Sequence, residues 1–111
     1  MLLLSVVIPA YNQARTLPAV IESVLAQTIF QNAGPRSIEI IVVDDGSTDK
    51  TQAALIPYRK QIHVHYQKRR GLAQAREVGS KIARSPNVII VNADAVLAAN
   101  TLDLMTQVTT L

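Results

Sequence analysis

The chain has 111 residues, of which 49% are hydrophobic and none is cysteine. This length suits one domain with a packed core. The lack of cysteine excludes disulfide bonds, thiolate metal sites and a cysteine nucleophile.

The formal net charge of +3 is unevenly distributed along the chain. Residues 1–50 carry three basic and five acidic side chains, whereas residues 51–111 carry eight basic and three acidic ones. A basic half can attract an anion such as nucleic acid, an acidic lipid or a phosphorylated small molecule. With one Phe, three Tyr and no Trp, the chain has few rings for base stacking, which argues against a nucleic-acid binder built on an aromatic platform.

The apolar segment Met1–Ile8 is interpreted as a strand and not as a signal peptide, because it is short, lacks a basic start and runs into Pro9. No segment approaches the roughly 20 apolar residues of a membrane helix. We therefore expect a cytoplasmic protein, associated with a membrane only through a segment outside this sequence.

Strand and helix patterns alternate along the chain. Apolar runs predict three strands, the first closed by Pro9, at Leu3–Ile8, Ile38–Val43 and Val88–Val91, and an alternating pattern predicts a sheet-edge strand at Ile62–Gln67. Apolar residues at helical spacing predict four helices, at Leu17–Gln27 after an N-cap at Thr16, at Asp49–Leu55, at Leu72–Ile82, and after Asn100, the last carrying Leu102, Met105 and Val108. Residues 29–36 are predicted to form a surface loop. This order predicts a single α/β domain over residues 1–111, a three-layer α/β/α sandwich with a mostly parallel sheet.

The second predicted strand ends in two carboxylates, Asp44 and Asp45, followed by a glycine turn. In an open α/β sheet, ligands bind at the carboxyl ends of the strands. Ser47 or Thr48 is predicted to cap the next helix, with Asp49 in its first turn. The alternative is that both strand-end aspartates only terminate the strand and cap that helix.

Three predicted strand ends carry polar groups, at Pro9–Asn12, Asp44–Asp45 and Asn92–Asp94. In a parallel sheet they lie along one edge, where carboxylates could accept hydrogen bonds from a nucleobase or ribose, or bind a hard divalent cation. Tyr11 could stack on a base. The chain has neither G-x-G-x-x-G nor a P-loop, which argues against dinucleotide oxidoreductases and P-loop NTPases. A phosphate would therefore be held by a metal or by the basic turn Lys68–Gly71.

Three motifs, in order and at suitable spacing, resemble the nucleotide-sugar-binding half of family 2 glycosyltransferases, whose fold is called GT-A. The motifs are Val6–Asn12, Val42–Asp49, and Gly71–Arg76 with Gly79. The resemblance extends from about Leu3 to Leu104.

The resemblance implies a nucleotide site and a metal site. Tyr11 would lie against the nucleobase, Asp45 would accept a hydrogen bond from the base edge, and arginines would face the phosphates of the sugar-nucleotide. The segment Asn92–Asp94 stands where the family has its Asp-x-Asp motif, so Asp94 would bind Mg²⁺ or Mn²⁺. The residues implied to bind the nucleotide are Pro9, Ala10, Tyr11, Asn12, Asp44, Asp45, Arg70, Gly71, Arg76, Asn92 and Ala93.

The sequence departs from the family pattern in two ways. Asn92 replaces the first acid, and Ala95 stands where an acid often follows, so weak or absent metal binding is expected. The family also keeps its acceptor site and catalytic base beyond this motif, so no catalytic residue is assigned here and the chain is interpreted as a fragment of a longer transferase. The predicted function is binding of the donor, a nucleoside-diphosphate sugar, in an inverting glycosyltransferase that transfers the sugar to a hydroxyl of a glycan, lipid or protein. A UDP-sugar is the expected donor.

Two other classes of function remain open. One is a non-catalytic nucleotide-binding module, and the other is a flavodoxin-like interaction domain in which Asp44 and Asp45 form an acidic pocket. His63 and His65 share a strand face, but without a third ligand they are expected to form a wetter sheet edge and not a metal site.

Overall fold

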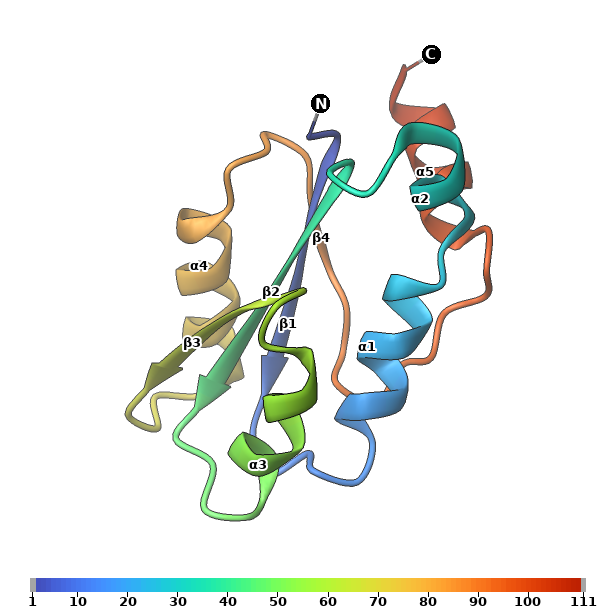
Figure 1. Cartoon of the computed structure of the whole chain (residues 1–111). Coiled ribbons are helices and arrows are strands. Elements are labelled where there is room, and N and C mark those ends of the chain that lie inside the picture. Colours follow the sequence, from blue (N-terminus) through green and yellow to red (C-terminus); the bar gives the residue numbers. More distant parts are fainter. Residues whose placement is uncertain (1, 111) are drawn as a thin grey trace.

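The computed structural model describes residues 2–110, with side chains as far as Met105. Four strands form one parallel sheet in the order β3-β2-β1-β4 (Figure 1). The strands are β1 (Leu4–Ala10), β2 (Ile38–Asp45), β3 (His63–Gln67) and β4 (Val88–Ile90). The predicted parallel sheet is confirmed.

Helices cover both faces of this sheet. Helix α4 (Leu72–Ile82) packs on one face, while α1 (Leu17–Leu25), α2 (Thr28–Ala33) and α5 (Thr101–Thr110) lie on the other (Figure 1). A short α3 (Thr51–Leu55) and a 3₁₀ turn, η1 (Ile56–Tyr58), connect β2 to β3. The three layers of the predicted α/β/α sandwich are therefore present. Among residues 2–110, no helix is long and apolar enough to cross a membrane.

Alternate residues of β1 face the two helical layers. Val6 and Ile8 belong to the larger core beneath α1, whereas Val7 packs with Ile41, Val43 and Ala75 of α4 in a second core. Because both faces are covered, every residue of β1 is buried. This double burial explains why the strand is a continuous apolar run and not an alternating one.

The first strand extends past its predicted end, and Pro9 lies inside it. The amide of Ser5 donates to the carbonyl of Asn87, and the carbonyl of Val7 accepts from Val91, so alternate residues of β1 bond toward β4. Pro9 is the next residue in this row, and β4 ends at Ile90. The missing N–H of Pro9 therefore costs no ladder hydrogen bond, and the prediction that proline closes the strand is wrong.

The segment 29–36 was predicted to be a loop, but most of it belongs to α2. Ile29 is buried in the main core, and the side chains of Thr28 and Asn32 donate to Asp103 of α5 at 3.2 and 2.7 Å. These partners come from far along the chain, so local sequence does not reveal them. The glycine and proline that indicated a loop lie just after the helix ends.

The other boundaries shift by a few residues. β2 continues through both aspartates, α1 ends at Leu25, and α3 begins at Thr51. The predictions for Leu72–Ile82 and for a helix after Asn100 are confirmed, while the side chain of Val108 lies outside the described part of the chain.

A polar cluster ties three segments together at the amino ends of the strands. The buried hydroxyl of Ser5 donates to the carboxylate of Glu39 and accepts from the amide of Ser85 at 3.1 Å. Glu39 also accepts from the amide of Arg84 at 2.6 Å and from its Nε at 3.2 Å. The cluster joins β1, β2 and the segment that leads into β4.

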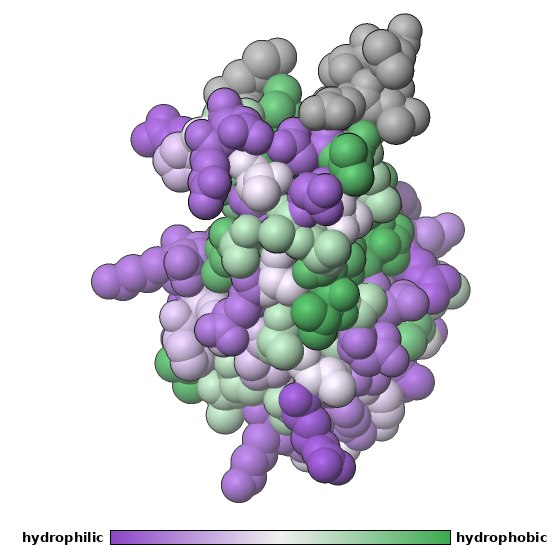
Figure 2. All heavy atoms as spheres, turned by 90° about the vertical axis from the view of Figure 1, so that its right-hand side faces the viewer, coloured by the Kyte–Doolittle hydropathy of each residue, from purple (hydrophilic) through white to green (hydrophobic). Residues whose placement is uncertain are grey.

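Apolar surface remains exposed beyond β4. Seen from the side of α1, α2 and α5, apolar atoms occupy the middle of the face (Figure 2). The exposed apolar side chains on β4, on the following loop and on α5 are Ile90, Val96, Leu104 and Met105. Within the described residues, β4 has a strand neighbour on one side only.

The closest approach of α4 to the sheet generates a stability prediction. A Cβ atom on Gly79 would lie 2.3 Å from Cγ1 of Val7 and 3.2 Å from Cγ2 of Val43. Gly79→Val should lower the free energy of unfolding in urea by about 3 kcal/mol, because the branched side chain forces helix and sheet apart. Ser80→Val, the same new side chain on the exposed side of α4, should change it by less than about 0.5 kcal/mol. Equal losses in the two variants would show that close packing at Gly79 does not limit stability.

Candidate functional site at the carboxyl edge of the sheet

The carboxyl ends of the strands form the candidate site. The chain proceeds from β1 to β2 and β3 in one direction and then returns to place β4 on the other side of β1. Ligands of open α/β sheets bind at this kind of reversal. Tyr11 follows β1, Asp44 and Asp45 end β2, and Asn92–Asp94 follow β4, so the sheet brings the three predicted strand ends to one edge.

Asn12 fastens two of the loops at this edge. Its backbone has a φ of 52°, in the left-handed region that asparagine tolerates better than most residues. Its amide donates to the hydroxyl of Ser47, and its Oδ1 accepts from the amides of Thr48 and Asp49 at 2.8 and 3.2 Å. Asn12 was predicted to bind nucleotide, and in this structure its side chain hydrogen-bonds to the loop after β2.

The caps of the neighbouring helices differ from those predicted. Ser47 and Thr48 bind Asn12 and do not cap α3, whereas Asp49 accepts from the amide of Thr51 at 2.9 Å. Thr16 precedes α1, but its side chain makes no cap hydrogen bond. In both places a distant loop offers these hydroxyl groups a partner that is absent from the local sequence.

Asp45 organises the β3–α4 turn. Its side chain has an exposed fraction of 0%. Oδ1 accepts from Nε2 of Gln67 at 3.0 Å and from the amide of Arg70 at 2.8 Å. Oδ2 accepts from the guanidinium of Arg69 at 2.6 Å and from the amide of Gly71 at 2.9 Å. The carboxylate therefore receives four hydrogen bonds, two on each oxygen.

These hydrogen bonds keep Asp45 charged. Burial on its own raises the pKa of the carboxyl, but the donors from Gln67, Arg70, Gly71 and Arg69 together outweigh burial and hold the pKa below the ordinary value of 3.8. With all its acceptor positions used, Asp45 does not form an open acidic pocket with Asp44. The interaction domain that depended on such a pocket has no support at this edge.

Arg69 lies across the predicted base site. Its guanidinium carbon is 3.6 Å from the centre of the Tyr11 ring, and its NH1 group bonds to Asp45. The turn approaches β2 so closely that a Cβ on Gly46 would lie 2.6 Å from the amide nitrogen of Arg69. Gly46 also has a φ of 70°, so both the close approach and the backbone conformation require glycine.

Asp44 points to the face opposite Asp45, because successive residues of a strand alternate. Its side chain is buried, and Oδ1 accepts from the amide of Ser47 at 3.1 Å. Oδ2 has no hydrogen-bond partner among the described residues. Asp44 therefore holds the turn after β2 and keeps one acceptor position unused.

Helix α1 and the residues that flank it hold the loop that carries the predicted metal ligand, since Ser23 lies in the helix, Thr16 just before it and Gln27 two residues after it. The hydroxyl of Thr16 donates to the carbonyl of Ala93 at 2.7 Å, and that of Ser23 accepts from the amide of Leu97 at 3.1 Å. The buried Gln27 donates to the carbonyl of Ala98 at 2.7 Å and accepts from the amide of Leu102 at 2.9 Å. Sequence reasoning missed Ser23 and Gln27, although two polar residues on a largely apolar helix were a possible signal.

The loop itself leaves Asn92 and Asp94 exposed, while Ala93 is buried. Within the described residues, no group of three or more histidine, aspartate or glutamate side chains is placed to hold a metal. His63 and His65 lie on the edge strand β3 and belong to no such group. An exposed carboxylate such as Asp94 fits a cation that draws its remaining ligands from a bound diphosphate and water.

The predicted basic residues reach the edge to different degrees. Arg70 and Gly71 contribute main-chain amides to Asp45, whereas the Arg70 side chain is exposed. Arg76 lies exposed on α4. Pro9 and Ala10 are buried within β1, so in the segment predicted to bind the base only the residues after the strand, beginning with Tyr11, can contact a ligand through their side chains.

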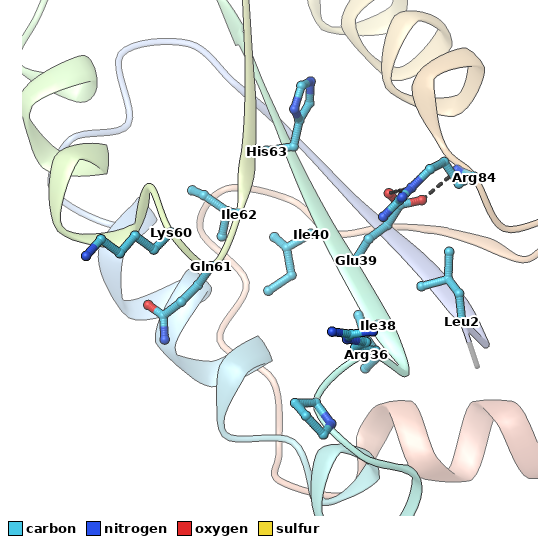
Figure 3. A pocket seen from close by; sticks show the side chains of 11 residues that line it. Leu2, Arg36, Ile38, Glu39, Ile40, Lys60, Gln61, Ile62, His63 and Arg84 are labelled. Carbon is cyan, nitrogen blue, oxygen red and sulfur yellow. Dashed lines mark hydrogen bonds and ion pairs between the residues drawn. The ribbon is translucent and has the colours of Figure 1, made fainter.

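A broad hollow of about 730 Å³ lies at the opposite edge, near the amino ends of β2 and β3 (Figure 3). Arg36, Lys60 and His63 contribute to its lining, and the Glu39–Arg84 ion pair closes one side. None of the residues predicted to bind nucleotide or metal lines this hollow. The carboxyl edge therefore remains the candidate site.

Comparison with known families decides the assignment. Residues 5–108 match the model of "Glycosyl transferase family 2". The chain belongs to this family. The resemblance found in the three sequence motifs is thus confirmed over nearly the whole chain.

Family 2 relatives and solved structures agree with this assignment. The chain is 35% identical over 109 residues to Glycosyltransferase GlyG of Streptococcus pneumoniae, covering 95% of this chain and 34% of that protein. S. aureus TarS 1-349 in complex with UDP matches with a TM-score of 0.85 and 26% identity, over 96% of this chain and 31% of that chain. The mannosyltransferase PcManGT of Pyrobaculum calidifontis, in complex with GDP-Man and Mn²⁺, matches with a TM-score of 0.80 and 25% identity, over 96% of this chain and 31% of that protein.

These matches show the GT-A fold, as expected from the sequence. The chain spans about a third of the length of GlyG, of TarS 1-349 and of PcManGT, and 19% of the longer TarS chain. Activity, donor and acceptor of the whole protein are therefore matters for proposal.

The buried Asp45 of this family 2 chain generates a prediction about pH. Above the ordinary pKa of 3.8, folded and unfolded chains both carry the charge, and the stabilisation is fully present. As the pH falls below that value the unfolded chain binds the proton first, so stability declines until the folded carboxyl is protonated as well. Asp45→Asn should lose about 3 kcal/mol of unfolding free energy at pH 7 and show a shallower decline below about pH 4.

The measurement is urea unfolding followed from pH 7 to pH 2.5. Asp94→Asn is the matched control, because it makes the same change at an exposed position and should leave both the stability and its pH dependence near those of the unaltered protein. An Asp45→Asn protein as stable as the control at pH 7 would contradict the structural role of this carboxylate.

Proposed function

We propose that this domain binds the donor, a nucleoside-diphosphate sugar, in an inverting glycosyltransferase, and that this donor is a UDP-sugar. The observation that carries the proposal is that the Tyr11 ring, the buried Asp45 and the exposed Asp94 lie at the carboxyl ends of β1, β2 and β4, along one edge of the sheet. The fold around this edge is similar to that of TarS, which has been solved with UDP and with UDP-GlcNAc. Because PcManGT has been solved with GDP-Man, a GDP-sugar is the second candidate donor.

The roles divide along the edge. Tyr11 offers a ring face to the base, and Asp45 would offer a charged acceptor beside it once one of its four present donors leaves. Asn92 can hydrogen-bond a ribose hydroxyl. The exposed guanidinium groups of Arg70 and Arg76 lie on the turn and helix next to this edge, where they can approach phosphate oxygens as the donor binds.

Asp94 is the residue that would hold a divalent cation. Its carboxylate is exposed, and Mg²⁺ is commonly bound through one or two carboxylates together with substrate phosphates. When bound, the cation would neutralise charge on the leaving diphosphate. Because Asn92 adds no second charge, we infer weak binding of the cation in the absence of the nucleotide.

The acceptor site and the catalytic base are proposed to lie in the part of the family 2 relatives that this chain does not cover. In an inverting transferase a base removes the proton of the acceptor hydroxyl, which then attacks the anomeric carbon. No side chain of this domain is given that role. The domain instead fixes the leaving group in place for in-line attack.

Binding of UDP with and without Mn²⁺ tests the proposal. The unaltered chain should bind UDP more tightly with Mn²⁺, and Asp94→Ala should weaken that binding roughly tenfold or more while leaving metal-free binding unchanged. Titration calorimetry measures both. Glu77→Ala is the control, since it removes one exposed carboxylate from the outer side of α4. Failure of the unaltered chain to bind UDP or GDP under either condition would contradict the donor-site proposal.

A further inference from the structure

The base position proposed above is filled by a side chain of the protein itself. The guanidinium of Arg69 lies 3.6 Å from the centre of the Tyr11 ring and 2.6 Å from Oδ2 of Asp45. A guanidinium is planar and presents N–H groups at its edge. A nucleobase with a ring N–H has the same two properties, so Arg69 uses both groups that were predicted to recognise the base.

Asp45 has no free position for a further donor. Each of its oxygens already accepts two hydrogen bonds, which is the number of lone pairs on a carboxylate oxygen. A base N–H can therefore bond to Asp45 only if one of the present donors leaves. Its stacking on the Tyr11 face nearest Asp45 requires the same space to be cleared.

Arg69 is the donor best able to leave. The amides of Arg70 and Gly71 are main-chain groups just before α4, and Gln67 is a half-buried residue of β3. The side chain of Arg69, in contrast, is 49% exposed and ends a long flexible chain. Removing it from Asp45 disturbs no backbone hydrogen bond.

We propose that Arg69 is an internal competitor for the base. It covers Tyr11 and Asp45 in the free protein, and it must swing outward before a nucleotide can use them. The site is thus closed by a cation–π contact and an ion pair until a base displaces both. This inference rests on the proposed donor function, and it names a residue that determines how tightly the base binds.

Substitution of Arg69 tests the competition. Arg69→Ala should bind uridine about tenfold more tightly than the unaltered chain, because the base no longer displaces a cation–π contact and a half-exposed ion pair. Uridine is the probe because it carries no phosphate, so loss of a positive charge has little direct effect on it. Arg69→Lys keeps the charge without the flat group and should also bind uridine more tightly than the unaltered chain.

Lys81→Ala is the matched control. It removes one positive charge from an exposed side chain in the last turn of α4, and its affinity for uridine should equal that of the unaltered chain. Circular dichroism checks that each variant is folded, and if Arg69→Ala is not, Arg69→Lys carries the test. Titration of all four proteins with uridine and with UDP then gives the comparison.

The outcomes separate this inference from the proposed function. If the unaltered chain binds UDP but both Arg69 variants bind uridine equally or more weakly, Arg69 is a bystander or a direct ligand and the competition is overturned, while the donor site stands. If none of the four proteins binds UDP or uridine, the donor site fails and the competition fails with it. Tighter uridine binding in the two Arg69 variants, but not in the control variant, supports the inference.

Discussion

The buried carboxylate of Asp45 is the interaction on which the candidate site depends. A charge without solvent is costly unless donors surround it, and four donors do so here. Three of them come from Arg69, Arg70 and Gly71, so the same contact fixes the β3–α4 turn and the start of α4. One residue thereby sets the position of β2, the turn and the helix relative to one another.

A second constraint acts from the other side of the edge. The β1–α1 loop is fastened to the loop after β2 through Asn12, and the loop after β4 is fastened to α1 through Ser23 and to the residues on either side of that helix through Thr16 and Gln27. Each of these four side chains has a hydrogen-bond partner on another segment. These hydrogen bonds hold the crossing loops together, while Asn92, Asp94 and Arg70 remain exposed at the edge.

Sequence predicted the sheet well, because buried parallel strands have a continuous apolar pattern, and it predicted that the strand ends with Asp44, Asp45 and Asp94 share one edge. It predicted the partners poorly. Helix α2 depends on a contact with Asp103, and Pro9 is tolerated because β4 ends early. The contact between Arg69 and Tyr11 joins residues on separate loops. Such facts depend on tertiary neighbours, which hydrophobic periodicity does not encode.

The order of the strands also determines the order in which the site can assemble. The central strand β1 meets β2 through contacts that span 34 residues, as between Ser5 and Glu39, but it meets the segment before β4 through contacts that span 80, as between Ser5 and Ser85. Closing the longer loop costs more chain entropy, and such non-local pairings are slow to form. The half of the edge with Tyr11 and Asp45 is therefore expected to fold first, and the loop with Asp94 to join a partner surface that already exists.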